Sequence, residues 1–416
     1  MRNYQIKLIL VIFFYCTTLE AFSQEKGKDI GFPDHIILNV TEDLSTSMAF
    51  NWRTDDSQSI SKIQIAKENA SNNFVENSLE YLAQSEFLDF KDLKHWYHSI
   101  LLKDLEENTV YVYRVGNENK WSEWMNFKTI AKDQSALKFL YFGDVQTNIK
   151  SLWSRVVQQS NRSVPDAQFV LYAGDIVNRG NNLNEWEEWF TAAQAINQSI
   201  PVMPASGNHD HADNEKGEYV LSKYWNRQFN LPHNGISSLD ESSYYVNIQH
   251  AKFVVLNTEL FDTDEGIRKD QLEWLEEVLK KDKKEWTILL MHHPIYSTKK
   301  NRDNTELRVL VKPLIDKYNV DLVLQGHDHT YARGKDRIPM DNNQKSNATY
   351  VVTVSGPKLT EVMGADWMDK SFSFTQLFHE VEIVKNKLFF KTYNSKGAIV
   401  DRFSIQKSNG KNKIIN

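Results

Sequence analysis

The chain has 416 residues, a formal net charge of −6 at pH 7, and a composition of 41% hydrophobic, 12% aromatic and 25% charged residues. This length suits two domains, and this composition is that of a folded globular protein, which excludes a disordered or fibrous chain. The mild acidity, with lysines and arginines scattered along the chain, gives no reason to expect nucleic-acid binding.

The first 23 residues have the pattern of a cleaved signal peptide. Arg2 and Lys7 precede the apolar stretch Leu8–Cys16, and Ala21–Ser23 offers small residues for cleavage. The apolar stretch is too short to span a bilayer, and no later one is long enough, so we expect no membrane span. We expect instead a secreted or periplasmic protein. Cleavage also removes Cys16, the only cysteine, so any metal must be bound by His, carboxylate or amide groups.

Residues 33–130 contain short alternating stretches of apolar residues separated by turn residues, with no helix of useful length between them. The expected strands are 35–40, 48–52, 62–66, 98–102, 110–115 and 125–128. This pattern predicts an all-β sandwich of about a hundred residues, with Trp52 in its core. The stretch Leu105–Tyr111 resembles the turn and tyrosine corner of fibronectin type III domains, and the polar stretch 131–135 is the expected linker.

From residue 137 to residue 406 strands alternate with helices, which is the pattern of a layered α/β domain. The expected strands are 137–142, 169–172, 202–204, 253–256, 287–291, 322–324 and 350–354. The best amphipathic helices are expected at 185–195 and 269–281. Residues 377–405 alternate again and should form closing antiparallel strands. The polar residues 407–416 are expected to fray.

Side chains that can bind metals follow five of these strands, at the point where each strand ends. They are Asp144, Asp175, Asn208 with His209, His292, and His327 with His329. Each one alone would fit a helix cap, a turn or a structural histidine. In open α/β sheets, however, side chains beyond the carboxyl ends of the strands gather at one edge. Five strand ends that carry only nitrogen and oxygen ligands therefore predict a metal centre.

The order of these residues resembles the calcineurin-like metallophosphoesterases. The motifs are Asp144, Gly174-Asp175-x-x-Asn178, Gly207-Asn208-His209-Asp210, His292-His293-Pro294 and Gly326-His327-x-His329. With the preceding sandwich, residues 33–405 resemble purple acid phosphatases and their bacterial relatives. The resemblance implies a two-layered β-sandwich covered by helices (α/β/β/α) over residues 137–406. It also implies two metal ions bridged by Asp175, one bound by Asp144 and His329 and the other by Asn208, His292 and His327.

Two positions depart from the patterns of these families. Purple acid phosphatases have a tyrosine three residues after the bridging aspartate, where this chain has Asn178. Many other members have a histidine two residues after the first aspartate, where this chain has Gln146. Gln146, Asn178 or water could complete the first metal site, and such oxygen ligands favour divalent Mn, Mg or Fe over Fe(III) at that site. The expected cofactor is a pair of divalent or mixed-valence ions of Mn, Fe or Zn. Without a phenolate ligand we predict a colourless enzyme.

The resemblance implies hydrolysis of a small phosphorylated substrate, in which a metal-activated hydroxide attacks a phosphomonoester. His209 is the candidate proton donor to the leaving group, with Asp210 or Asp328 to orient it. The stretch Gly174–Gly180 resembles a segment of protein phosphatases that supplies a phosphate-binding arginine, which is Arg179 here.

His293, Tyr331 and Arg302 are expected to line the substrate pocket, and the stretch 355–358 is expected to form another wall. The same site would also suit a phosphodiesterase or a nucleotide pyrophosphatase. An alternative of a different class is an exported binding protein with a degenerate catalytic domain. The complete set of metal ligands argues against that alternative.

Overall fold

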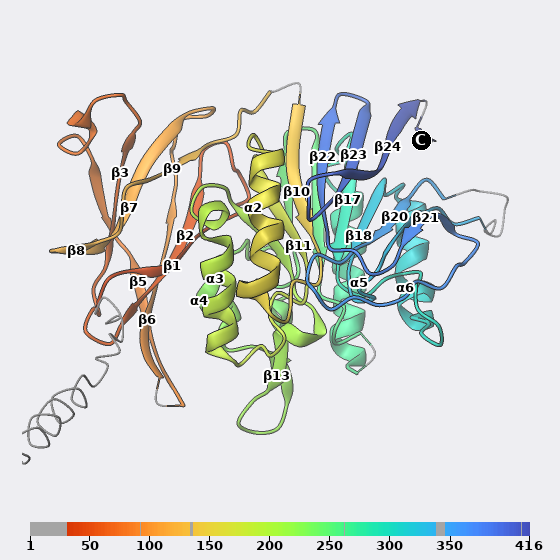
Figure 1. Cartoon of the computed structure of the whole chain (residues 1–416), viewed down its shortest axis with the longest axis horizontal. Helices are drawn as coiled ribbons and strands as arrows, with labels where there is room; N and C mark the ends of the chain where they lie inside the picture. Colours follow the sequence, from red (N-terminus) through yellow and green to blue (C-terminus); the bar gives the residue numbers. More distant parts are fainter. Residues whose placement is uncertain (1–30, 92, 134–135, 262, 338–345, 409) are drawn as a thin grey trace, which may run out of the picture.

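The computed structural model describes residues 31–91, 93–133, 136–261, 263–337, 346–408 and 410–416. The predicted signal peptide lies outside the described residues. An all-β portion stands beside a larger layered portion of strands and helices (Figure 1). Within the described residues, no helix has the length and apolar character needed to cross a membrane.

The N-terminal portion is a sandwich of two antiparallel sheets, as the alternating pattern predicted. One sheet contains β1 (Asp34–Asn39), β2 (Met48–Asp55), β6 (Leu93–Leu102) and β5 (Gln84–Phe90). The other contains β4 (Leu79–Leu82), β3 (Lys62–Lys67), β7 (Val110–Asn117), β8 (Lys120–Trp121) and β9 (Met125–Lys128). Trp52 is buried in the core, and the hydroxyl of Tyr111 accepts a hydrogen bond from the Glu106 amide at 2.8 Å. The sequence pattern missed β4 and β5, because most of their side chains are exposed and lack a clear apolar alternation.

The sandwich is joined to the rest of the molecule through the backbone of one sheet. Strand β1 lies parallel to β12 (Val202–Ala205), and the Val40 amide donates to the Val202 carbonyl at 3.1 Å. The result is an 11-stranded sheet in the order β25-β24-β23-β22-β10-β11-β12-β1-β2-β6-β5. This continuous sheet fixes the N-terminal strands beside the layered portion.

Two sheets face each other in the layered portion. The first uses β10 (Ala136–Phe142), β11 (Phe169–Ala173) and β12, extended by β22 (Leu377–Val384), β23 (Lys387–Asn394), β24 (Ile399–Ser408) and β25 (Lys411–Ile415). The second has seven strands, β15 (Tyr244–Ile248), β16 (Ala251–Leu256), β17 (Trp286–Met291), β18 (Leu322–Gln325), β20 (Thr349–Val352), β19 (Tyr331–Gly334) and β21 (Met368–Phe372). Helices cover the outer faces: α2 (Ser154–Ser163) and α3 (Leu183–Asn197) on the first sheet, α5 (Glu265–Lys280) and α6 (Thr305–Lys317) on the second (Figure 1). The predicted α/β/β/α arrangement is confirmed.

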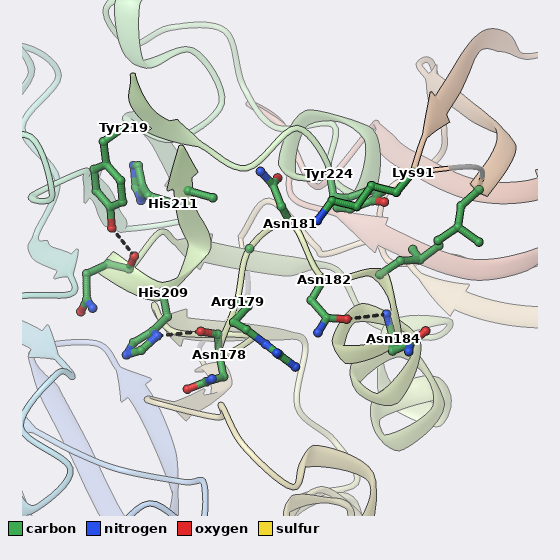
Figure 2. Close-up of a pocket in the computed structure, with 15 residues that line it drawn as sticks. Lys91, Asn178, Arg179, Asn181, Asn182, Asn184, His209, His211, Tyr219 and Tyr224 are labelled. Carbon is green, nitrogen blue, oxygen red and sulfur yellow. Dashed lines mark hydrogen bonds between the residues drawn. The ribbon is translucent and has the colours of Figure 1, made fainter. Parts of the chain in front are cut away.

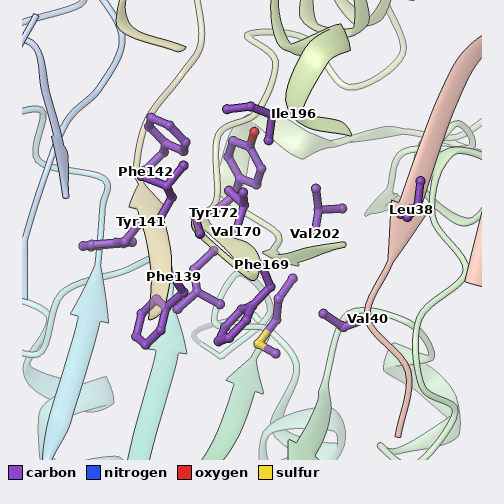
Figure 3. Packing of buried hydrophobic residues seen from close by; sticks show 14 of the residues in the cluster. Leu38, Val40, Phe139, Tyr141, Phe142, Phe169, Val170, Tyr172, Ile196 and Val202 are labelled. Carbon is purple, nitrogen blue, oxygen red and sulfur yellow. The ribbon is translucent and has the colours of Figure 1, made fainter. Parts of the chain in front are cut away.

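The central strands are apolar along their whole length because both of their faces are buried. Phe139 and Phe169 point towards the second sheet, where each lies edge-on to Phe253 at 5.4 and 5.3 Å between ring centroids. On the opposite face of β11, Tyr172 packs against Trp189 of α3 at 5.6 Å. Figure 3 shows Phe139 and Phe169 on one side of these strands and Tyr172 on the other. Strands held from both faces form a rigid base for the loops at their carboxyl ends.

The expectation that residues 407–416 fray is wrong. Strand β24 continues to Ser408, and β25 pairs antiparallel with it. The side-chain amide of Asn412 donates to the Asp321 carboxylate at 2.8 Å, and Ile414 packs against the main core. These tertiary contacts order a segment whose composition alone looks like a solvated tail.

Candidate metal centre

The predicted ligands extend from the carboxyl ends of neighbouring strands in the two facing sheets. Strands β10, β11, β12, β17 and β18 are followed respectively by Asp144, Asp175, Asn208, His292, and the pair His327 and His329. Four of these residues have left-handed backbone conformations, with φ of 47° at Asp144, 52° at Asp175, 72° at His327 and 57° at His329. Such a conformation is unusual for residues other than glycine and often marks a functional site. Here it turns the chain sharply after β10, β11 and β18.

The first group of ligands consists of Asp144, Asp175 and His329. Their ligand atoms all lie within 4.8 Å of one another, and all three residues are buried. Gln146 joins this group, because its Nε2 lies 2.5 Å from Asp175 Oδ2 and 3.4 Å from His329 Nε2. The side-chain amide of Gln146 therefore lies beside this group, and a rotation of the amide would turn its oxygen towards Asp175 and His329.

The second group of ligands consists of Asn208, His292 and His327. Asn208 Oδ1 lies 3.0 Å from His327 Nδ1 and 3.2 Å from His292 Nε2. The two imidazole nitrogens lie 3.0 Å apart. Asp175 Oδ1 lies 3.4 Å from His292 Nε2, so the Asp175 carboxylate reaches both groups. This is the position that a bridging carboxylate requires.

The hydrogen bonds of His292 show why the second group suits a cation. Its Nδ1 lies 2.8 Å from the Ala173 carbonyl, which can only accept, so Nδ1 carries the hydrogen. In neutral His292, Nε2 is then a lone pair directed at Asn208 Oδ1 and Asp175 Oδ1, which are also acceptors. Converging lone pairs repel one another unless a positive charge lies between them. The residues present therefore fit two metal ions.

The buried carboxylates place a strong demand for positive charge on this site. Burial raises the pKa of Asp144 well above its usual value. Burial would also raise the pKa of Asp175, but the charge of His292 and the hydrogen bonds from His292 and His209 hold it below its usual value. Burial would lower the pKa of His292, yet the Asp175 carboxylate raises it to about 10. A proton on His292 or a metal ion would each compensate the negative charge of these carboxylates.

Glycines border the ligands because a side chain would collide with them. A Cβ atom on Gly207 would lie 2.3 Å from Asp175 Oδ1 and 2.8 Å from His292 Cε1. A Cβ atom on Gly326 would lie 2.6 Å from Asp144 Oδ2. These contacts give a physical reason for the glycines in two of the motifs.

His209 lies at the edge of the metal centre. Its backbone amide donates to Asp175 Oδ1 at 2.9 Å, and its ring Nδ1 donates to the carbonyl of Asn178 at 2.7 Å. Asn178 therefore orients the imidazole through its backbone. This arrangement leaves Nε2 of His209 as the atom that can exchange a proton with a substrate.

The structure corrects the role expected for Asp210. Its buried carboxylate accepts hydrogen bonds from the backbone amides of Gly207 at 2.8 Å, Ile176 at 3.0 Å and Val177 at 3.4 Å. Burial and the nearby charge of Asp175 raise the pKa of Asp210 to about 7. Asp210 therefore holds together the two loops that carry Asp175 and His209, and does not orient the His209 ring.

Asp328 likewise serves a different residue from the one expected. Its Oδ1 accepts from Arg302 at 2.8 Å, and its Oδ2 accepts from the Thr298 amide at 2.6 Å. Arg302 also donates to the His327 carbonyl at 3.3 Å, which brings it to the rim of the second ligand group. The ring of His293 lies 4.2 Å from that of His327. The structure therefore brings Arg302 and His293 beside the metal centre.

The prediction that Tyr331 lines the pocket is wrong. Tyr331 is 1% exposed and lies in β19, inside the sandwich of the two sheets. Its hydroxyl donates to the Asp401 carboxylate at 2.8 Å, and its ring stacks on His379. Its position after the His-x-His motif suggested a pocket residue, but the alternation of the strand turns its side chain into the core.

Lys358 lies closer to the metal centre than we expected when we predicted that residues 355–358 form a wall of the pocket. Its Nζ lies 3.3 Å from Gln146 Oε1 and 3.5 Å from His209 Nε2. The loop is fastened to the first ligand strand, since the Gly356 amide donates to the Asp144 carbonyl at 2.9 Å. Sequence reasoning had no means of pairing Lys358 with residues more than a hundred positions away.

A cavity of about 640 Å³ adjoins the metal centre on the His209 side. Arg179 lines it, with a side chain that is 68% exposed and an Nε that donates to Glu185 at 2.7 Å. The short hairpin β13 (His211–Asp213) and β14 (Tyr219–Leu221) forms another part of the wall, which the sequence pattern missed. Tyr219 of this hairpin donates to the Asn208 carbonyl at 2.6 Å. Figure 2 shows this cavity with His209 at its edge.

Two facing sheets with outer helices, and paired groups of candidate ligands at their strand ends, are the architecture of a calcineurin-like metallophosphoesterase domain, and the comparisons identify such a domain in this part of the chain. The family model described as "Calcineurin-like phosphoesterase" matches residues 137–331. The model described as "Purple acid Phosphatase, N-terminal domain" matches residues 33–129. The resemblance to purple acid phosphatases is thereby confirmed for both portions of the chain.

Several curated relatives are purple acid phosphatases of plants. The chain is 27% identical over 245 residues to purple acid phosphatase 21 of Arabidopsis thaliana, a match that covers 57% of this chain and 53% of that protein. It is 26% identical over 344 residues to probable purple acid phosphatase 20 of the same plant, covering 80% and 75%. The chain therefore matches only about half the length of the first of these relatives.

Solved structures of the same fold include a purple acid phosphatase from yellow lupin (Lupinus luteus) seeds. It matches with a TM-score of 0.75 and 18% identity over 91% of this chain and 75% of that one. The structure of PhoD matches with a TM-score of 0.68 and 13% identity over 93% and 92%. At these identities the likeness establishes the fold.

Proposed function

We propose that this protein is an exported phosphatase that hydrolyses phosphomonoesters with two metal ions. The observation that supports it most directly is the Asp175 carboxylate, which lies between two groups of nitrogen and oxygen ligands. A relative 27% identical over 255 residues is named Fe(3+)-Zn(2+) purple acid phosphatase 12, which supports a divalent or mixed-valence pair. The pattern of the first 23 residues supports export.

When bound, the two ions activate water near neutral pH and offset the negative charge of the phosphoryl oxygens. The protein residues around them divide the remaining tasks. His209 keeps the hydrogen of Nδ1 on the Asn178 carbonyl, so in its doubly protonated imidazolium form it can give the Nε2 proton to the leaving oxygen. Lys358 adds a fixed positive charge beside His209 and Gln146, where it can bind a phosphoryl oxygen.

Metal removal and a matched substrate pair test this function. We expect purified protein to bind roughly two equivalents of Mn, Zn or Fe and to remain colourless, because residue 178 is an asparagine. Hydrolysis of p-nitrophenyl phosphate should disappear on chelation, return with metal, and exceed hydrolysis of bis(p-nitrophenyl) phosphate. Faster hydrolysis of the diester would assign the site to a phosphodiesterase. No metal uptake after reconstitution would favour the exported binding protein.

Replacing Lys358 by methionine should weaken phosphate binding more than it slows turnover. We expect the KM for p-nitrophenyl phosphate and the inhibition constant of inorganic phosphate each to rise about tenfold, which is the loss of one charge-assisted hydrogen bond. Lys358→Arg should restore part of the affinity. Lys396→Met is the control, since Lys396 is exposed in the turn between β23 and β24. Unchanged constants in Lys358→Met would remove this residue from the substrate site.

A further inference from the structure

The cavity beside the metal centre is built by both portions of the chain. Lys91 and Leu93, which flank the tip of the β5–β6 hairpin, come from the N-terminal sandwich. The rest comes from residues 178–184, 208–209, 211–212, Tyr219 and Tyr224 of the layered portion. Figure 2 shows Lys91 across the cavity from His209. The sandwich therefore contributes to a surface that a substrate at the metal centre can reach.

The hairpin is held in place by contacts with the layered portion. Glu86 of β5 forms an ion pair with Arg227 of helix α4 (Trp225–Gln228). The ring of Phe90 lies edge-on to Tyr224 at 6.0 Å between centroids, and Lys223 Nζ lies 3.4 Å from the centroid of the same ring. These contacts lie next to Lys91 in the sequence, and they fix the position of its backbone relative to the cavity.

Lys91 and Arg179 bring positive charge to the lining of the cavity, and Arg179 shares its charge with Glu185, which pairs with its Nε at 2.7 Å. None of its 15 lining residues is an aspartate or a glutamate, whereas Lys91 and Arg179 each carry a full positive charge. Asn178, Asn182 and Asn184 add amide groups to the wall. Glu185 lies outside the lining, and its carboxylate accepts from Arg179 Nε and from the backbone amides of Asn178 and Arg179. Such a lining suits an anion and disfavours a cation.

The cavity also lies on the side of the centre from which a leaving group departs. Asn208 and His209 belong both to the cavity wall and to the metal centre. A phosphoryl group at the metal ligands, with its leaving oxygen facing His209 Nε2, therefore directs the rest of the substrate into this cavity. The volume of about 640 Å³ is ample for a sugar phosphate.

We propose that this cavity is the leaving-group subsite and that it selects phosphate esters whose leaving group carries a second phosphate. Lys91 of the sandwich and Arg179 of the layered portion bind that second phosphate. The inference rests on the proposed function, and it gives the N-terminal sandwich a direct part in substrate recognition.

Sugar phosphates that differ only in the second phosphate provide the test. With the full-length, metal-loaded enzyme, kcat/KM for fructose 1,6-bisphosphate should exceed that for fructose 1-phosphate and fructose 6-phosphate by about tenfold or more. This gain is larger than the factor of about two expected from a second ester group alone. Lys91→Met should lower the ratio of bisphosphate to monophosphate kcat/KM about tenfold.

The control is Lys94→Met, on the same hairpin. Lys94 lies outside the cavity, its side chain is 52% exposed, and it pairs with Asp89 at 3.8 Å. This variant should keep the wild-type ratio. Equal kcat/KM for mono- and bisphosphates, or an unchanged ratio in Lys91→Met, would overturn the inference and leave the phosphatase intact. If the enzyme hydrolysed none of the three esters, that result would instead overturn the proposed function itself.

Discussion

Asp175→Asn is expected to lower phosphatase turnover by roughly 1000-fold or more, because the amide cannot bridge two cations as the carboxylate does. Asparagine has the same shape and can still accept the hydrogen bond that the His209 amide donates to Asp175 Oδ1 at 2.9 Å. The loop should therefore keep its structure while the site loses charge. Metal content by elemental analysis and turnover of p-nitrophenyl phosphate are the measurements.

The matched control is Asp166→Asn, which removes a carboxylate that is 65% exposed and pairs with Lys138. This variant should retain both metal and activity. Circular dichroism should show that Asp175→Asn and the control both remain folded. Near-wild-type turnover in Asp175→Asn would contradict the assignment of the bridging ligand.

Gly207→Ala should have the second largest effect, although the substitution removes no candidate metal ligand. Gly207 has φ −109° and ψ 178°, a conformation that alanine adopts readily, so the backbone carries no penalty. The added methyl group would, however, lie 2.3 Å from Asp175 Oδ1 and 2.5 Å from the Asp175 amide. One of these groups must move, and misplacing a reacting group by about 1 Å costs on the order of 100-fold in kcat/KM.

Gly364→Ala controls for the substitution itself, since a Cβ atom at Gly364 would meet nothing within 4 Å. We expect wild-type metal content and kinetics from this variant. Reduced metal content in Gly207→Ala, with a normal circular dichroism spectrum, would show that the effect is local. Normal metal content and turnover in Gly207→Ala would contradict the geometry found around Asp175.

The continuity between the two portions changes how the N-terminal sandwich should be understood. Composition and alternation separate residues 33–130 from residues 137–406, and each portion matches its own family model. The backbone pairing of β1 with β12 nevertheless makes one sheet of them, and the β5–β6 hairpin reaches the cavity. The N-terminal sandwich, which the sequence pattern separates from the layered portion, is thus placed to contact the substrate of that portion.

The amino-acid sequence by itself determined the sandwich and the layered domain, and it predicted the candidate metal ligands. These features are local: apolar periodicity defines the strands, and a ligand immediately after a strand must lie at its carboxyl end. Gln146 was predicted from the family pattern, because it stands two residues after Asp144, where many members of the family have a histidine.

Only the tertiary structure decided which residues meet around those ligands. Asp210 supports backbone amides, Tyr331 faces the core, and Lys358 reaches His209 across 149 positions in the chain. Such contacts depend on how strands from distant segments are ordered and on which face each side chain takes. A change of one residue in register would send Tyr331 to the other face of its strand, and no local pattern contains that information.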